Sequence, residues 1–414
     1  MYAGFKQFLR SRRRTGEERD HKNGEDATPA GLPVHNQHRV LVTVKSKPLI
    51  ACSLVGKHRL KRIAIALSVL VSIVAGGCAN QPVDGAPQQV LIPLVYVTDR
   101  SLNDGARPGR YYGGGRGAPQ AGIATVAVST HGAEPNPFAD WRRWEPRLDG
   151  SRRRNEFVSV SASGTPPIQT VTDFAVTVGT GTAIVYVHGF RRRFDTASVN
   201  FAELLYQVSP DAVPILYSWP STGGLLNYRD DVENLQWSNG TLQSLLVQLL
   251  ADPKIETIHV VAHSLGAFAL LEAVAAVADN STEELSPGLG QIILVSPDVA
   301  RERFESKYLP IIRENDLQVT IYAAENDVPL RTSRRVNKGE RVGDAKKQVP
   351  VFAGIETVLV SDVVSIMNSH DSHLEVAQVQ IDIAYLLNDG LPADSRPTLQ
   401  RTDSDYWRIK PDLP

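Results

Sequence analysis

Short runs of apolar, often β-branched residues recur along the chain, separated by polar stretches and by segments with helical spacing. A run of this kind, bounded by turn residues, is typical of a strand buried on both faces. Between two of these runs, leucines at 242, 245, 246 and 249 follow helical spacing from about Tyr228 onward. Runs buried on both faces indicate a parallel sheet in an α/β fold. The segments that contain the expected strands are 90–98, 125–129, 157–161, 182–190, 214–219, 257–266, 291–298 and 317–327.

The run at 257–266 breaks abruptly into a polar Ser264 between small residues. A strand that turns sharply into a helix needs little bulk, and Ala262 and Gly266 leave the Ser264 hydroxyl exposed as a nucleophile. The usual first glycine of this signature is Ala262 here. The alternative is a serine that only caps the following helix.

The run at 182–190 ends in His188-Gly189-Phe190, followed by a loop rich in arginine. Acyl transfer passes through a negatively charged oxygen, which two backbone amides can stabilise. The amides of Phe190 and Leu265 are the candidates for this oxyanion hole. We interpret His188 as a structural histidine, because the base of such a site comes last in the chain.

Two later strands finish on a carboxylate, Asp298 and Asp327. Parallel strands collect functional residues at their carboxyl ends, so both are candidates for the catalytic acid. We prefer Asp327, which follows the second strand after the nucleophile, and keep Asp298 in reserve as a residue that orders the loop.

Histidines downstream of Ser264 occur only at His370 and His373. We prefer His370 as general base, with His373 in reserve. Two histidines separated by two residues could also bind a metal, but no HExxH, paired CxxC or dense carboxylate loop supports that reading. We expect no metal and no cofactor. A glycine run at 113–117 is not a phosphate loop, because no Gly-Lys-Ser/Thr follows it.

Several of these segments together resemble an uncharacterised bacterial α/β-hydrolase family, the domain of unknown function nine hundred. The resemblance implies an α/β-hydrolase fold, with a mostly parallel central sheet and helices on both faces. It also implies a Ser-His-Asp triad and no particular substrate. It covers about residues 90–390. It rests on VHGF at 187–190, LYSWPS at 216–221, Gly224, Tyr228, Asp231, Glu233, WS at 237–238, AHSLG at 262–266, SPD at 296–298 and ND at 326–327.

Two segments depart from the family pattern. Arg191, Arg192 and Arg193 replace small polar residues, which indicates either an anionic substrate or lipid surface, or simply a solvated loop. Residues 369–371, Ser-His-Asp, stand where the family tends to have Gly-His and an aromatic stretch. Trp219 either lines the acyl pocket or packs in the core.

Composition is that of an ordinary globular protein, with 42% hydrophobic and 21% charged residues among 414. The charge is split along the chain. Residues 1–77 carry 14 Lys and Arg against 5 Asp and Glu, which leaves 30 against 40 for the remainder. The acidic body, and the lack of aromatic residues among the front cations, argue against nucleic-acid binding.

The basic front is better explained by export. Basic residues at 57–62 precede a dozen mostly apolar residues at 63–74, and Gly76-Gly77-Cys78 follows. This is a signal-peptide pattern with an apolar segment too short for a comfortable membrane span. Cys78 resembles the lipidated cysteine of bacterial lipoproteins. We therefore expect a lipid anchor in the cell envelope, on the outer membrane facing the periplasm. Cys52 is the other cysteine, so no disulfide is expected after cleavage.

The signal pattern begins far from Met1, and residues 1–54 show no core pattern. We expect this leader to be disordered or to lie upstream of a true start at Leu54 or Val55. The expected organisation is a leader at 1–54, a signal peptide at 55–77, a tether at 78–89, the hydrolase domain at 90–390 and a surface tail at 391–414.

Two classes of function remain. The order Ser264, Asp327, His370 favours a serine hydrolase, an esterase or lipase-like enzyme for a small-molecule or lipid ester. The alternative is a non-catalytic envelope lipoprotein that uses the fold as a binding module, because a fold alone does not imply catalysis.

Overall fold

The computed structural model describes residues 88–412, with gaps at 104–107, 131–154, 209, 223–226, 281–284, 286–287 and 366–368. The expected signal peptide, Cys78 and most of the expected tether lie outside the described residues. Within them, no helix is long and apolar enough to cross a membrane.

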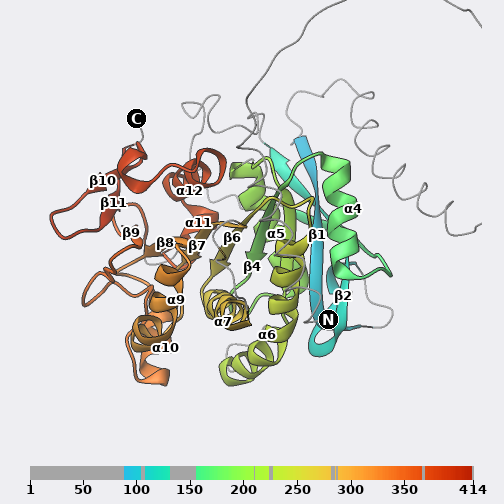
Figure 1. Ribbon diagram of the computed structural model, residues 1–414, viewed down its shortest axis with the longest axis horizontal. Coiled ribbons are helices and arrows are strands. Elements are labelled where there is room, and N and C mark those ends of the chain that lie inside the picture. The colour runs from blue at the N-terminus through green and yellow to red at the C-terminus, as the bar shows by residue number, and fades with distance from the viewer. Residues whose placement is uncertain are drawn as a thin grey trace, which may run out of the picture. The chain divides into compact units, whose positions relative to one another are not determined.

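A single sheet of eleven strands organises the described residues (Figure 1). The centre of the sheet is a run of parallel strands, in the spatial order β11-β9-β8-β7-β6-β4-β5-β1. Strands β2, β3 and β10 are antiparallel additions at the two edges. The mostly parallel sheet predicted from the sequence is confirmed. The strand order is β10-β11-β9-β8-β7-β6-β4-β5-β1-β2-β3. The bounds are β1 Gln88–Leu102, β2 Tyr112–Thr130, β3 Glu156–Ala162, β4 Thr182–Val187, β5 Val213–Ser218, β6 Thr257–His263, β7 Leu289–Val295, β8 Gln318–Ala323, β9 Glu356–Leu359, β10 Leu399–Arg401 and β11 Trp407–Ile409.

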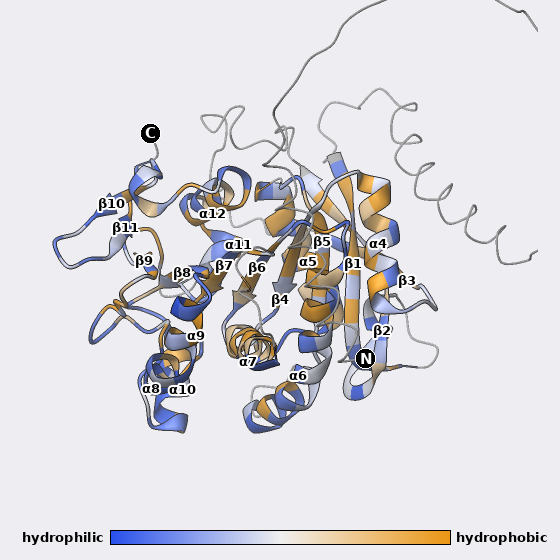
Figure 2. Ribbon diagram, in the orientation of Figure 1, coloured by the Kyte–Doolittle hydropathy of each residue, from blue (hydrophilic) through white to orange (hydrophobic). Residues whose placement is uncertain are grey.

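Central strands are apolar on both faces because helices cover both. In β4, Ile184 and Tyr186 belong to one hydrophobic core, while Val185 and Val187 belong to the other. Successive side chains of a strand point to opposite faces, so a strand buried on both sides becomes one continuous apolar run. Figure 2 shows apolar residues along the central strands and on helix α7, Leu265–Asn280.

The helices divide between these two cores. Helices α4, α6, α7 and α9 contribute to the core that contains Val185 and Val187, whereas α5 and α12 contribute to the core that contains Ile184 and Tyr186. The helix predicted from the leucine spacing is confirmed as α6, whose four leucines at 242–249 are buried. The bounds are α4 Pro167–Val178, α5 Phe194–Val208, α6 Tyr228–Ala251, α7 Leu265–Asn280, α8 Arg301–Arg303, α9 Leu309–Glu314, α10 Val328–Asn337, α11 Ser372–Glu375 and α12 Ala377–Asp389.

The parallel run places the carboxyl ends of β4, β6, β7 and β8 along one edge of the sheet. Chain segments that are far apart in sequence therefore meet there. The glycine run at 113–117 lies on another part of the sheet, inside β2, and forms no phosphate-binding loop.

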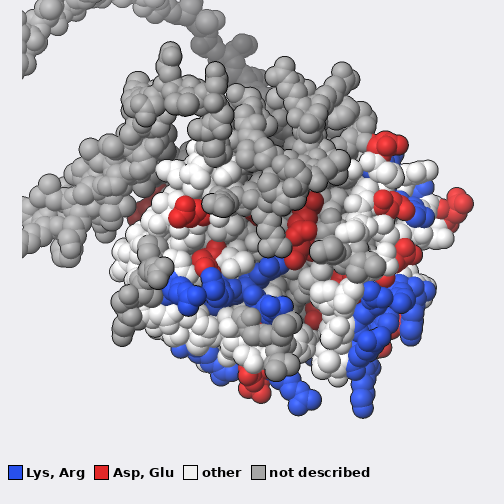
Figure 3. All heavy atoms as spheres, turned by 180° about the vertical axis from the view of Figure 1, so that it is seen from behind, with Lys and Arg blue, Asp and Glu red and all other residues white. Residues whose placement is uncertain are grey.

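Charged side chains of both signs occupy the surface. Figure 3 shows the face turned away in Figure 1, where groups of Lys and Arg are separated by Asp and Glu. Among the described residues, surface ion pairs include Arg303 with Glu272 at 2.7 Å. Exposed pairs of this kind contribute little each, so stability rests mainly on the two cores.

The segment after α12 does more than cover the surface. Strand β11 pairs in parallel with β9 and antiparallel with β10, which extends the sheet. A buried ionic network fixes the segment: Arg396 donates to Asp382 at 2.7 Å, and Tyr322 donates to the same carboxylate at 2.5 Å. Both members of the ion pair are fully buried.

Replacing Arg396 with Ala should destabilise the protein by about 3–5 kcal/mol, because Asp382 would stay buried without its cation. The measurement is the urea midpoint of unfolding. The matched control is Arg401→Ala, since Arg401 is paired with Asp405 on the surface with side chains 66% and 79% exposed, and should cost under about 1 kcal/mol. Equal losses from the two variants would contradict this account.

Candidate active site

The chain turns from β6 into α7 at Ser264. Ser264 has φ +53°, a left-handed conformation that L-residues rarely adopt. Such a conformation costs about 1–3 kcal/mol and persists only where neighbours hold it. The Ser264 amide donates to Val295 O at 2.9 Å, and its carbonyl accepts from Asp298 N at 3.0 Å. The serine is thus fixed at the carboxyl edge of the sheet, where it is buried (3% exposed) rather than exposed as expected from the sequence.

Small residues around Ser264 are required to different degrees. A Cβ on Gly266 would lie 2.5 Å from the backbone oxygens of Val187 and His188. Glycine is therefore needed for α7 to pass β4 closely. Ala262, by contrast, is a buried strand residue opposite Val187, where a methyl group fits. This explains how the signature tolerates alanine in place of its first glycine.

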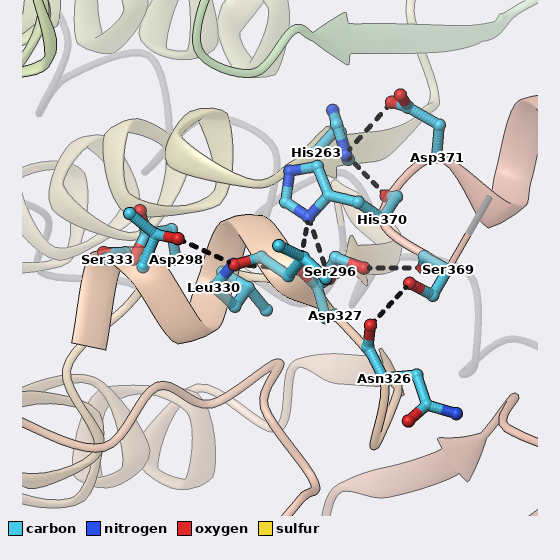
Figure 4. Close-up of polar contacts among 12 residues, drawn as sticks. His263, Ser296, Asp298, Asn326, Asp327, Leu330, Ser333, Ser369, His370 and Asp371 are labelled. Carbon is cyan, nitrogen blue, oxygen red and sulfur yellow. Dashed lines mark hydrogen bonds and ion pairs between the residues drawn. The ribbon is translucent and has the colours of Figure 1, made fainter. Parts of the chain in front are cut away.

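His370 and Asp327 lie in hydrogen-bond contact (Figure 4). The His370 Nδ1 atom lies 2.8 Å from Asp327 Oδ2 and 3.0 Å from Oδ1. A carboxylate only accepts, so Nδ1 carries the proton and Nε2 keeps its lone pair. Asp327 is fully buried and also caps α10, because its Oδ1 accepts from Leu330 N at 2.9 Å.

The environment of His370 favours its protonated form. Burial by itself would lower the pKa of His370, but the carboxylates of Asp327, Asp371 and Asp298 outweigh burial and raise that pKa above its ordinary value. A histidine with this pKa is well placed to exchange a proton near neutral pH.

Asp298, the reserve candidate for the acid, has other partners. It accepts from Ser333 at 2.7 Å and from Tyr228 at 3.0 Å, and it pairs with Arg341 at 3.3 Å. Its side chain therefore links the β7 loop to α6 and α10 rather than to a histidine.

His373, the reserve candidate for the base, lies behind the site. It is fully buried and shares a hydrogen bond of 3.0 Å with the Tyr186 hydroxyl. Burial lowers the pKa of His373 to about 3, so it is neutral at physiological pH. Its ring packs on His263, with centroids 4.7 Å apart.

The segment that carries His370 is held from two sides. His263 Nε2 donates to the His370 carbonyl at 2.9 Å, and Ser369 Oγ donates to Asn326 O at 3.2 Å (Figure 4). Burial lowers the pKa of His263 well below its usual value, so this donor is the neutral ring. Among the described residues, no group of three or more His, Cys, Asp or Glu could hold a metal ion.

A family model described as "alpha/beta hydrolase of unknown function (DUF900)" matches residues 169–382, about half of the 414 residues. The chain belongs to this family. The resemblance inferred from the sequence is confirmed over that range, and the matched range contains Ser264, Asp327 and His370. No curated protein matches the chain.

Three solved structures illustrate more distant similarity. A lipase-esterase related protein from Clostridium acetobutylicum is 11% identical at a TM-score of 0.28, covering 49% of this chain and 93% of its own. A putative hydrolase from Agrobacterium vitis is 10% identical at a TM-score of 0.30, covering 73% of this chain and 100% of its own. Carboxyl esterase 2 from Tuber melanosporum is 12% identical at a TM-score of 0.28, covering 79% of this chain and 99% of its own. Similarities this low say nothing about the chemistry of the DUF900 chain.

The loop after β4 lies against the candidate nucleophile. A Cβ on Gly189 would lie 3.0 Å from Ser264 Cβ. Leu265 is the first residue of α7, so its amide has no carbonyl acceptor within the helix. Phe190 packs edge-on against Tyr228, with ring centroids 5.4 Å apart. Both candidate oxyanion donors thus belong to segments that adjoin Ser264.

His188 supports the loop that follows β4. It is fully buried, and its Nδ1 donates to Gly189 O at 2.9 Å. Trp219 stacks on its ring at 5.0 Å and donates to its carbonyl at 2.8 Å. Trp219 is fully buried in the core, which answers the question of whether this side chain lines a pocket or packs in the core.

Sequence reasoning missed Arg100, which supports the same loop. Arg100 is 1% exposed and donates to Arg192 O at 2.7 Å, to Gly113 O and Ser221 O at 3.0 Å each, and to Ser218 Oγ at 2.9 Å. Burial lowers the pKa of Arg100 to about 10, so it remains a cation. The available signal was a charged pair, Asp99-Arg100, at the end of an apolar strand.

The three arginines of the loop have different surroundings. Arg192 forms an ion pair with Asp371, and Arg193 forms one with Asp195 nearby in sequence. Arg191 is exposed and has φ +61°. The loop is therefore more than a solvated group of like charges, because two of its three cations have carboxylate partners.

Proposed function

We propose that the protein is a serine hydrolase that cleaves carboxylic esters through an acyl-serine intermediate. The observation that carries the proposal is the Asp327–His370 contact of 2.8 Å at the sheet edge where Ser264 adopts its strained turn. Membership of an α/β-hydrolase family supports the same chemistry.

In the proposed reaction Ser264 Oγ attacks the ester carbonyl carbon while its proton passes to His370 Nε2. Asp327 holds the imidazole in the required tautomer and stabilises the imidazolium that forms. Collapse of the tetrahedral intermediate breaks the bond to the alcohol, which takes the proton from His370. Water then attacks the acyl-serine by the same route and releases the acid.

The developing oxyanion would bind the amides of Phe190 and Leu265. Each such donor contributes roughly 10²–10³ in rate when it is fixed in advance. Their fixation is supported by the packing of Gly189 on Ser264 and by the hydrogen bonds that Arg100 and His188 make to the loop.

The proposed setting is the cell envelope, with a lipid on Cys78 holding the enzyme to the outer membrane on its periplasmic side. The support is the order of basic, apolar and small residues before Cys78. A small-molecule or lipid ester would be the substrate there. The alternative role, a binding module without catalysis, predicts an inert Ser264.

A fluorophosphonate probe separates the two roles. We expect the folded protein to gain one phosphonyl adduct, located on the peptide that contains Ser264, because an activated serine attacks phosphorus as it attacks an acyl carbon. Heat-denatured protein is the control and should not react. Folded protein without an adduct would favour the binding module.

A further inference from the structure

An ion pair joins the two loops on which the proposed catalysis depends. Arg192, in the loop that supplies the Phe190 amide, donates to Asp371, the residue directly after His370. The partners are 179 residues apart in sequence, and their side chains are 23% and 27% exposed. Neighbouring Arg193 instead pairs with Asp195, two residues along.

We propose that Arg192 and Asp371 are a positioning pair, which holds the oxyanion loop and the His370 loop together and sets the reactivity of Ser264 through His370. This inference rests on the proposed function.

Both ends of the pair are anchored next to the reacting groups. The Arg192 carbonyl accepts from the buried Arg100 at 2.7 Å. The Asp371 carboxylate lies 3.6 Å from Nε2 of His263, and this ring also donates to the His370 carbonyl (Figure 4). His263 directly precedes Ser264, so the contact reaches from the oxyanion loop to the nucleophile turn.

The oxyanion loop also packs directly against His263, close to this ion pair. A Cβ on Gly189 would lie 2.7 Å from His263 Nδ1. Little space therefore separates the oxyanion loop from the histidine that supports His370. A change that releases Arg192 from Asp371 removes a tether across this contact, and a displacement of about 1 Å can lower a rate about 10²-fold.

Asp371 also acts on His370 through its negative charge. Burial would raise the pKa of Asp371, but the nearby N–H of His263, the Arg192 cation and His370 outweigh burial and hold that pKa well below its usual range. Asp371 is thus a constant negative charge beside the base. Among the described residues, the other titratable groups near His370 are the carboxylates Asp327 and Asp298 and the neutral rings of His263 and His373.

The two partners therefore act differently on the proposed base. Removing Arg192 loosens the loops but leaves the anion of Asp371 next to His370. Removing the charge of Asp371 loosens the loops and also takes away one of the carboxylates that raise the pKa of His370. General structural damage would not distinguish the two variants in this way.

The test is the rate of fluorophosphonate labelling as a function of pH, using the full chain. Both Arg192→Ala and Asp371→Asn should lower the plateau rate at least about tenfold. The midpoint of the acid limb should move to lower pH in Asp371→Asn and should not do so in Arg192→Ala. The exchanged variant, Arg192→Asp with Asp371→Arg, should recover plateau rate while its midpoint stays low.

Arg193→Ala is the matched control, because it removes the adjacent arginine and an ion pair that lies within its own segment. Thermal unfolding checks that each variant folds, and Arg192→Gln replaces Arg192→Ala if the alanine variant does not fold, because glutamine also removes the cation. The conservative double variant, Arg192→Lys with Asp371→Glu, keeps the ion pair and should keep both the plateau and the midpoint near wild type.

The inference is overturned if Arg192→Ala and Asp371→Asn label as fast as Arg193→Ala, or if Asp371→Asn leaves the midpoint unchanged. Wild-type protein that does not label at any pH contradicts the proposed function instead. The two failures are therefore distinct.

Discussion

Replacing Ser264 with Ala is expected to lower ester hydrolysis by at least about 10³-fold, and by up to roughly 10⁶-fold. Alanine removes the oxygen that forms the acyl bond, and His370 then has no proton to accept. The oxyanion amides and the binding contacts remain, so a residual rate above that in water should persist. The measurement is turnover of a p-nitrophenyl ester of short chain length.

The matched control for this variant is Ser296→Ala. Ser296 directly follows the adjacent strand β7, is buried, and has a left-handed φ of +45° like Ser264. Among the described residues, its hydroxyl donates one hydrogen bond, to the Ser369 carbonyl at 3.4 Å. We expect a loss below about tenfold from this long contact. If both serines give equal losses, the effect of Ser264→Ala is general damage to the sheet edge and the nucleophile is elsewhere.

The strands and the turn at Ser264 were predictable because their signals are local. A strand covered on both faces must be apolar throughout, so β4, β6, β7 and β8 stand out from any polar segment. The turn requires small residues at fixed spacing, and Gly266 meets the backbone of β4 so closely that its identity is dictated. The buried leucine face of α6 follows from its periodicity for the same reason.

The contacts made by charged residues were not predictable in this way. Arg100 and Arg192 are ordinary surface residues by type, and only the meeting of β1, β4 and the His370 loop gives them partners. Short strands gave equally little signal, because β10 and β11 have three residues each, too few for a pattern. Their segment is held in place by the buried ion pair of Arg396, which lies before β10, with Asp382 of α12.

The choice between Asp298 and Asp327 shows where sequence reasoning stops. Both follow buried strands, and both lie at the same edge of the sheet. What separates them is the direction of each side chain: Asp327 faces His370, whereas Asp298 faces Ser333 and Tyr228. That direction depends on α10, because Asp327 caps it.

Replacing Asp327 with Asn is therefore expected to lower the hydrolysis rate on the order of 10⁴-fold, because the amide cannot hold the imidazole in the tautomer that accepts the Ser264 proton. The pH profile should change as well. His370 must be neutral to act as base, so activity falls as the pH drops through its raised pKa. Without Asp327 burial acts with less opposition, and the acid limb should move to lower pH.

Asp298→Asn is the matched control for Asp327→Asn, because it is the same substitution in the segment that follows the adjacent strand β7. It removes a charge that also raises the pKa of His370, so a small shift of the acid limb in the same direction is expected. Its loss of rate should stay below about 10²-fold, because the His370 tautomer is set elsewhere. A larger loss in Asp298→Asn than in Asp327→Asn would make Asp298 the acid and would require the His370 loop to rearrange in the reacting enzyme.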